Sequence, residues 1–202
     1  MAKLDFNPDG YQYDQGLKAI KLMWVAASQA LESRESEVLR EIEDYWKHVE
    51  SGGEPIGEWD GPDRLWDHAD ELRLEMLALT EAGAELNRAT AIAIYHHWER
   101  HVPNESKERN RNHRTLTSAL KKADIDVHSD LDALYYATNF LKHGNQTWLQ
   151  KLEVKFSAKF PNLRNIEPNF PAWWSKLSLD KLHVEWFFEI AKASKRPFFL
   201  EL

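Results

Sequence analysis

The chain has 202 residues, of which 33 are acidic and 26 basic, and its formal net charge is −7. This balance argues against a surface that binds nucleic acid throughout, although it leaves room for a local basic patch. Because the sequence contains no cysteine, disulfides, thiolate metal sites and a cysteine nucleophile are excluded.

Length and apolar content set further expectations. The length is typical of one domain, so we predict that residues 1–202 form a single α-helical domain. No segment resembles a signal peptide and no apolar run reaches the length of a membrane span, so we expect a cytoplasmic protein that does not enter a membrane. Nine tryptophans and an apolar tail, residues 196–202, offer surface for a subunit interface, which leads us to expect a homodimer.

Helical periodicity dominates the first quarter of the chain. We predict an irregular lead-in over residues 1–13, because Asn-Pro-Asp-Gly is a turn signal, and then helix from about Asp14 to Glu50. The polar stretch 32–37 belongs either to one long helix or to a junction between two. Four glycines and two prolines predict a loop over residues 51–62.

A second long helix is predicted from Pro62 to about His101, where Pro103 stops it. Gly83 is a potential interruption, but the apolar content continues beyond it. Between residues 32 and 60, ten acidic side chains accompany only three basic ones. We interpret this stretch as a solvated acidic face, and the alternative is a patch that meets a basic partner.

The second helix ends in a histidine-rich sequence. His97 and His101 are four residues apart, a spacing at which two imidazoles can chelate a metal ion. Their order, H-x-E-x-H, differs from the H-E-x-x-H of zinc proteases. A metal would also need a third ligand, for which the candidates are His48, His68 and His183. We favour a structural interpretation, with aromatic side chains packed inward and charged ones at the rim, and we predict no metal and no cofactor.

Residues 101–122 are basic, with a local net charge of +4. One interpretation is a solvated connection that ends in a short helix over Thr115–Lys122. The other is a surface that contacts phosphate groups, because arginine can bind phosphate through two parallel hydrogen bonds. The candidate RNA-binding residues are Arg109, Arg111, Arg114, Lys121 and Lys122.

Residues 131–150 begin with the spacing of an amphipathic helix. Ser129 and Asp132 form a capping-box-like start, and Gly144 is a natural helix stop.

Three polar side chains gather near the end of this helix. Asn139 and His143 lie one turn apart on the same face, and Lys142 is beside them. A helix C-terminus favours the protonated imidazole, so His143 is a candidate acid or phosphate contact. The alternative is an ordinary solvated helix end.

The rest of the chain is predicted to be less regular. Residues 146–152 carry a weak helical signal, whereas residues 153–177 lack a period and are predicted as an extended loop. Val154 and Phe156 alternate as in a short strand.

Within that loop, Trp173 and Trp174 are predicted to insert into the core. Ser178 is then the predicted N-cap of a last helix that reaches about Ser194.

The order of motifs resembles a known family. A long apolar helix ends in Tyr-x-x-x-Glu at Tyr95 and Glu99, a polar connection follows, and the next helix ends in TNFLKHG at residues 138–144. This order resembles the HEPN superfamily, small α-helical bundle proteins of prokaryotic defence and toxin–antitoxin systems. Their usual signature is Arg-Asn-x-x-x-His near a helix end, and Asn139 and His143 match it in register.

The resemblance covers roughly residues 65–150. It implies an all-α, HEPN-like helical bundle with long antiparallel helices and an irregular C-terminal segment before the last helix. In active members it implies metal-independent RNA cleavage across a homodimer, with histidine transferring a proton and arginine stabilising charge on the phosphate. Thr138 stands where that arginine is expected. Lys142 or Arg100 would have to supply the charge, although lysine does not reproduce the planar guanidinium fork.

Two hypotheses follow from the resemblance. The first is an endoribonuclease of a defence or toxin–antitoxin system, with catalytic residues His143, Asn139, Lys142 and Arg100. On this hypothesis, Thr138→Arg would raise cleavage. The second is a non-catalytic HEPN-like module that dimerises and binds RNA or a protein partner, such as an antitoxin or another defence protein.

Overall fold

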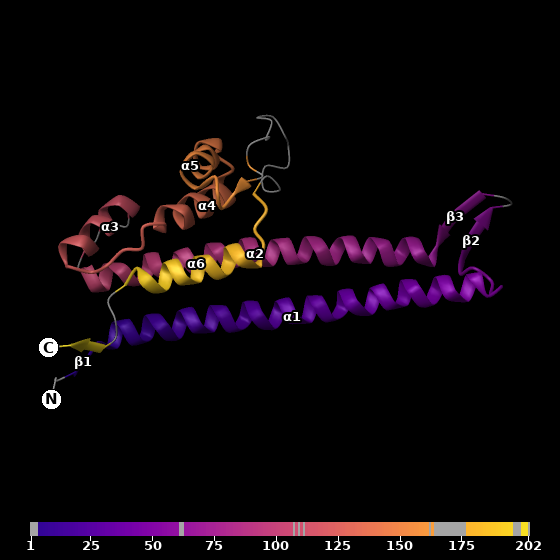
Figure 1. The fold of residues 1–202 in the computed structure, drawn as a ribbon, viewed down its shortest axis with the longest axis horizontal. Coiled ribbons are helices and arrows are strands. Elements are labelled where there is room, and N and C mark those ends of the chain that lie inside the picture. The colour runs from indigo at the N-terminus through magenta and orange to yellow at the C-terminus, as the bar shows by residue number, and fades with distance from the viewer. Residues whose placement is uncertain are drawn as a thin grey trace. The chain divides into compact units, whose positions relative to one another are not determined.

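The computed structural model describes residues 4–60, 63–106, 108, 110, 112–161, 163, 177–195 and 199–201 (Figure 1). Six helices and two pairs of short strands occur within these ranges, so the predicted all-α class is confirmed. In the described part of the chain, no helix is both long enough and apolar enough to cross a membrane.

Internal contacts divide the chain into two compact units. The smaller comprises residues 24–86, and the larger comprises residues 1–23 and 87–202. Each is described by itself below. The expectation that both belong to a single domain stays a prediction.

Helix α1 spans Pro8–Glu50. The predicted irregular lead-in is wrong, because strand β1 (Leu4–Phe6) precedes the helix and Pro8 is the first helical residue. Proline suits this position, since its fixed φ matches the helix and an N–H there would have no helical partner. The polar stretch 32–37 is part of one continuous helix and not a junction.

In the smaller unit, Arg34 accounts for the helical conformation of that polar stretch. Its guanidinium donates to Glu37 and Glu41 on α1, at 3.2 and 3.0 Å, and to Glu75 on α2 (His68–Ser106) at 2.7 Å. These groups are partly exposed, so each pair contributes modestly to stability. Together these ion pairs offset part of the negative charge of α1 and link it to α2.

Two short strands join α1 to α2. Strands β2 (Gly57–Asp60) and β3 (Asp63–Asp67) form an antiparallel hairpin. The prediction that residues 51–62 are loop throughout is therefore wrong for residues 57–60, and residues 61 and 62 lie outside the described residues. Helix α2 consequently begins at His68, later than predicted, where the Asp67 carboxylate accepts a hydrogen bond from the Asp70 amide at 2.8 Å.

Helix α2 also extends further than predicted. Gly83 lies inside it without a break, and Pro103 lies in its last part instead of ending it. Proline removes one backbone hydrogen bond, but its φ is compatible with helix, and few residues follow it.

The core of the larger unit lies around α4 (Leu131–His143), which packs against α5 (Gln146–Phe156) and α6 (Lys181–Ala193). Val154 and Phe156 belong to α5, so the alternative of a short strand there is wrong. Trp173 and Trp174 lie outside the described residues.

Buried hydrogen bonds connect three helices of the larger unit. The Trp98 indole on α2 donates to the Ser194 carbonyl at the end of α6, at 2.8 Å. The Tyr13 hydroxyl on α1 donates to the Ala191 carbonyl on α6, also at 2.8 Å. Both aromatic side chains are fully buried, so these bonds satisfy polar groups that would otherwise be costly inside the core.

Two predicted caps are corrected by the structure. Asp130 precedes α4 and makes no capping bond with its side chain, so Ser129 does not begin a capping box. Helix α6 is capped by Asp180, whose carboxylate accepts from the His183 amide at 2.9 Å, and not by Ser178.

The C-terminal tail contacts the N-terminal strand. Strand β4 (Phe199–Glu201) pairs antiparallel with β1, with Leu4 opposite Glu201. Over these residues the tail docks on its own chain. The homodimer stays a prediction.

Thr138 is fully buried on α4, and its hydroxyl faces the Ala91 carbonyl of α2 at 3.5 Å. The position that the HEPN signature assigns to arginine is therefore a tightly packed core position in this chain.

Introducing arginine at this position should destabilise the protein. We expect Thr138→Arg to lower the free energy of unfolding by about 3–5 kcal/mol, because it buries a charge without a partner. Thr138→Val keeps the shape and loses only a long hydrogen bond, so it should cost less than about 1 kcal/mol. Urea denaturation followed by circular dichroism measures both. An arginine variant as stable as the wild type would contradict the burial of this position.

Candidate nucleic-acid interface

The end of α4 is as predicted. Gly144 adopts the left-handed conformation with φ of 63°, and its amide donates to the Phe140 carbonyl. Lys142 and His143 are exposed in the last turn. Asn139 is half-buried, and its side-chain amide donates to the Tyr135 carbonyl at 2.8 Å.

Arg100 lies on α2, exposed, with its guanidinium donating to the His96 carbonyl at 3.3 Å. Among the interactions of the described residues, none joins Arg100 to Asn139, Lys142 or His143. A catalytic role for these four residues therefore stays a prediction.

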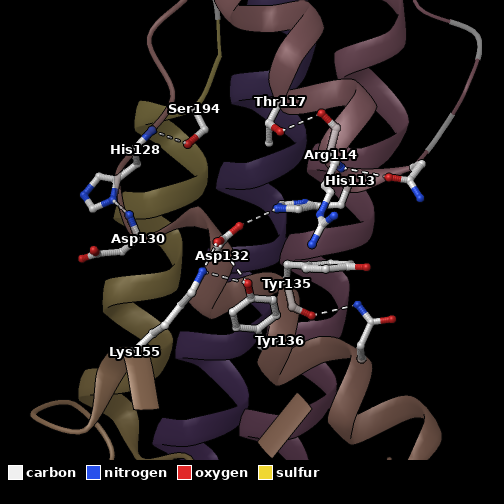
Figure 2. A network of polar contacts seen from close by, with 12 residues as sticks. His113, Arg114, Thr117, His128, Asp130, Asp132, Tyr135, Tyr136, Lys155 and Ser194 are labelled. Atoms are coloured by element: carbon white, nitrogen blue, oxygen red, sulfur yellow. Dashed lines mark hydrogen bonds and ion pairs between the residues drawn. The ribbon is translucent and has the colours of Figure 1, made fainter. Parts of the chain in front are cut away.

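A cleft of about 400 Å³ opens instead between α3 (His113–Lys122), α4 and α5 (Figure 2). Helix α3 confirms the predicted short helix and begins two residues earlier, capped by the Asn112 side chain. Each helix contributes polar or aromatic side chains to the cleft. They are Asn112, His113, Arg114, Thr117, Asp132, Tyr135, Tyr136, Trp148, Lys151 and Lys155.

His113 forms the base of this cleft and is 4% exposed. Its Nδ1 lies 3.2 Å from the Tyr95 hydroxyl, and its Nε2 lies 3.1 Å from the Asp132 carboxylate. Burial lowers the pKa of the His113 imidazole, although hydrogen bonding to Asp132 opposes this effect. The neutral ring satisfies both contacts, with Tyr95 donating to Nδ1 and Nε2–H donating to Asp132.

The His113 ring also stacks on Tyr135, with ring centres 4.0 Å apart and planes within 3° of parallel (Figure 2). Burial, with the nearby Glu99 charge, raises the pKa of Tyr95 well above its usual range. Tyr95 therefore stays protonated and keeps its role as donor. The three helices α2, α3 and α4 thus meet at one imidazole whose nitrogens are both occupied.

The Asp132 carboxylate joins α4 to α5. Besides His113, it accepts hydrogen bonds from the Tyr136 hydroxyl and the Lys155 ammonium, each at 3.1 Å (Figure 2). Desolvation opposes ionisation of Asp132, but the bonds from Lys155, His113 and Tyr136 outweigh it and hold its pKa below the usual value. The same bonds from Lys155 to Tyr136 and Asp132 raise the lysine's pKa. Both groups are therefore charged at neutral pH.

Aromatic side chains form one wall of the cleft. Trp148 on α5 stacks on Tyr136 with ring centres 5.7 Å apart and meets Tyr135 edge-on at 5.1 Å. The Lys151 ammonium lies 4.1 Å from the Trp148 ring centre, which is a cation–π contact. Tyr135 and Trp148 are both partly exposed, so their rings are accessible from the cleft.

Cations outnumber anions in this cleft. Arg114, Lys151 and Lys155 are positive, whereas Asp132 is the one carboxylate among the described lining residues. In the part of the chain that the structure describes, no carboxylate forms an ion pair with Arg114 or Lys151. These two cations are available for an anionic ligand, and the adjacent rings offer faces on which a flat group can stack.

Only part of the predicted RNA-binding set lies at the cleft. Arg114 lines it, and Lys121 and Lys122 are exposed at the far end of the same short helix. Arg109 and Arg111 lie outside the described residues.

Sequence reasoning missed most of the cleft. A signal existed in α5, where Trp148, Lys151 and Lys155 follow the i, i+3, i+7 spacing of one helix face. The adjacent tyrosines 135 and 136 were a second signal. Neither indicates by itself that the two helices face each other.

The metal alternative at His97 and His101 is not supported by the geometry. His97 is buried, and its Nε2 lies 2.8 Å from the Tyr13 carbonyl, an oxygen that can only accept. His101 Nδ1 lies 2.9 Å from the His97 carbonyl. Among the described residues, no three histidine, aspartate or glutamate side chains come together as metal ligands would.

Comparisons with models of protein families, with curated proteins and with solved structures found no match to this chain. The function is therefore inferred from the properties of the cleft.

The neutral buried imidazoles predict a loss of stability on mild acidification. Burial lowers the pKa values of His113 and His97, so the unfolded chain takes up protons at a higher pH than the folded one. Stability should be fully present above the ordinary histidine pKa of about 6.5 and should fall as the pH drops below it. The midpoint of urea denaturation, measured between about pH 7 and pH 5, checks this.

His113→Gln should remove part of this pH dependence, with His97 responsible for the rest. A denaturation midpoint that stays constant over the same pH interval would contradict the neutral state of both rings.

Proposed function

We propose that this chain is an HEPN-like module that binds single-stranded RNA in the cleft between α3, α4 and α5 without cleaving it. The observation that carries the proposal is the combination, in one cleft, of three cationic side chains with accessible aromatic rings. Single-stranded nucleic acid presents the matching groups, since its phosphates are anionic and its unpaired bases can stack.

Each part of the cleft has a role in this proposal. Arg114 and Lys151, which have no described carboxylate partner, would contact phosphate oxygens. Tyr135 and Trp148 would each offer a ring face or edge to a base. Lys155 is held by Asp132 and Tyr136 and would add positive potential to the cleft. A duplex would fit less well, because its bases are already stacked inside the helix.

The state of the cleft's titratable groups favours binding over catalysis. A general acid or base must be free to exchange a proton with the substrate. His113 uses both of its nitrogens within the protein, and Asp132 accepts three hydrogen bonds. Cleavage would therefore have to depend on His143, and the burial of Thr138 leaves the HEPN signature without its arginine.

The choice of RNA over DNA and the defence or toxin–antitoxin context rest on the HEPN resemblance alone. The homodimer rests on that resemblance and on the nine tryptophans and the apolar tail. All three belong to the same proposal, and their tests are separate from that of the cleft.

Binding to a labelled oligouridylate, measured by fluorescence anisotropy, tests the cleft. Trp148→Ala should weaken binding about 5- to 150-fold, which corresponds to loss of one stacked base at roughly 1–3 kcal/mol. Lys151→Glu should weaken binding and reduce the steepness of its salt dependence by about 0.7 in the log–log slope. The matched control is Lys192→Glu, an exposed lysine on α6 outside the cleft.

Comparison with oligothymidylate and with duplex RNA establishes the class of nucleic acid. Absence of binding at low salt, or equal losses in the Lys151 and Lys192 variants, would refute the cleft as the binding site.

Incubation of the same RNA without metal tests for cleavage. We expect intact RNA after incubation with the wild type, because the described cleft holds no free proton-transfer group. Cleavage that His143→Ala reduces by about 100-fold or more would restore the ribonuclease hypothesis. Circular dichroism of the variant controls for folding.

A further inference from the structure

The charge of this protein is divided between its two units. Residues 24–86, which we call the acidic arm, carry 17 acidic and five basic side chains, a net charge of −12. The remaining residues carry 16 acidic and 21 basic side chains, a net charge of +5. The modest charge of the whole chain therefore conceals two units of opposite sign.

The hairpin of the acidic arm exposes large apolar side chains. Ile56 is 54% exposed, Trp59 48%, Leu65 60% and Trp66 38%. Singly exposed apolar residues are ordinary, but four between residues 56 and 66 are a concentration that is typical of an interaction surface. We call residues 56–60 and 63–67 the arm tip.

Carboxylates surround these apolar side chains. Glu58 lies opposite Trp66 in the strand register and accepts a hydrogen bond from its indole at 3.3 Å. Asp60 and Asp63 form the last pair of the ladder and are exposed. The arm tip thus presents negative charge and indole rings together.

The negative charge of the acidic arm limits which kind of surface can bind the arm tip. Two arms placed against each other would bring together net charges of −12 each, which is unfavourable. A complementary surface must be basic and must offer apolar or aromatic contacts. The cleft between α3, α4 and α5 has both, in Arg114, Lys151 and the exposed ring of Trp148.

We propose that the arm tip of one copy binds the cleft of a second copy and competes there with RNA. Carboxylates would take the place of phosphates, and an indole would take the place of a base. A cleft of about 400 Å³ falls in the size range that holds compact ligands, so it can admit one aromatic side chain. The inference rests on the cleft of the proposed function, but it does not require that the cleft bind RNA.

Such a contact joins two different surfaces, so each copy has one donor and one acceptor site. Association of this kind closes into a ring when the geometry permits and otherwise extends into a chain. In either case it should weaken as salt rises, because it depends on opposite charges.

A mixing experiment with the full-length protein tests the inference. The tip variant carries Trp59→Ala and Trp66→Ala, and the cleft variant carries Arg114→Glu and Lys151→Glu. All four side chains lie at least partly in solvent, so folding should be retained, and circular dichroism checks it. Matched controls are Trp46→Ala, an exposed tryptophan of the acidic arm outside the tip, and Lys192→Glu.

At low salt, light scattering should show that the masses of the wild type and of both controls increase with protein concentration. Each test variant alone should keep a constant mass over the same concentration range. A mixture of the two variants should form a one-to-one complex, because one retains its cleft and the other retains its tip. Oligouridylate should dissociate the wild-type assembly.

Three results would overturn the inference. They are a wild type whose mass does not change with concentration, a test variant that associates as the wild type does, and a mixture that forms no complex heavier than either variant alone. The RNA-binding measurements test the proposed function separately from this inference. Normal RNA binding with a failed mixing test would leave the proposed function standing. A successful mixing test without RNA binding would leave the cleft as a protein-binding site.

Discussion

The arrangement of the larger unit depends on one buried imidazole. His113 on α3 contacts Tyr95 of α2 through one nitrogen and Asp132 of α4 through the other, and its face lies on Tyr135. A neutral ring satisfies all of these contacts at once, whereas a charged ring would carry the cost of burying its charge. Because α3 is short, this contact fixes its position more than its own helix propensity does. The cleft beside it exists only while α3 stays there.

Asp132 connects the His113 contact to α5. Its carboxylate is shared by His113, Tyr136 and Lys155, so the three cleft-forming helices are joined by one connected set of hydrogen bonds. Such networks stabilise when every member has a partner and are costly when one is lost. The consequence for function is that the titratable groups of the cleft are already occupied by one another. Its aromatic rings and the two cations without a carboxylate partner among the described residues remain available to a ligand.

Several features of the fold were predictable from the sequence, and the errors have specific causes. Apolar spacing indicated the long helices, and Gly144 indicated the end of α4, because these signals depend only on neighbouring residues. The hairpin over β2 and β3 was missed because its glycines and prolines were interpreted as loop signals, although Gly57 is part of a strand. Pro8 and Pro103 were interpreted as signals outside a helix, but tolerance of proline depends on its distance from the helix end.

The sequence by itself determined that this is a helical protein with an acidic stretch, a basic connection and a helix that ends at Gly144. It also placed Arg114 among the candidate phosphate contacts, since a cation in a basic segment is visible without a fold. Only the tertiary structure decided that Thr138 is a core position and that Trp148 and Lys151 line the same cleft as Arg114. The physical reason is that periodicity assigns a residue to a face of its own helix, whereas packing between helices decides which faces meet. A cleft built from three helices is therefore a property of the folded chain and not of any one of its segments.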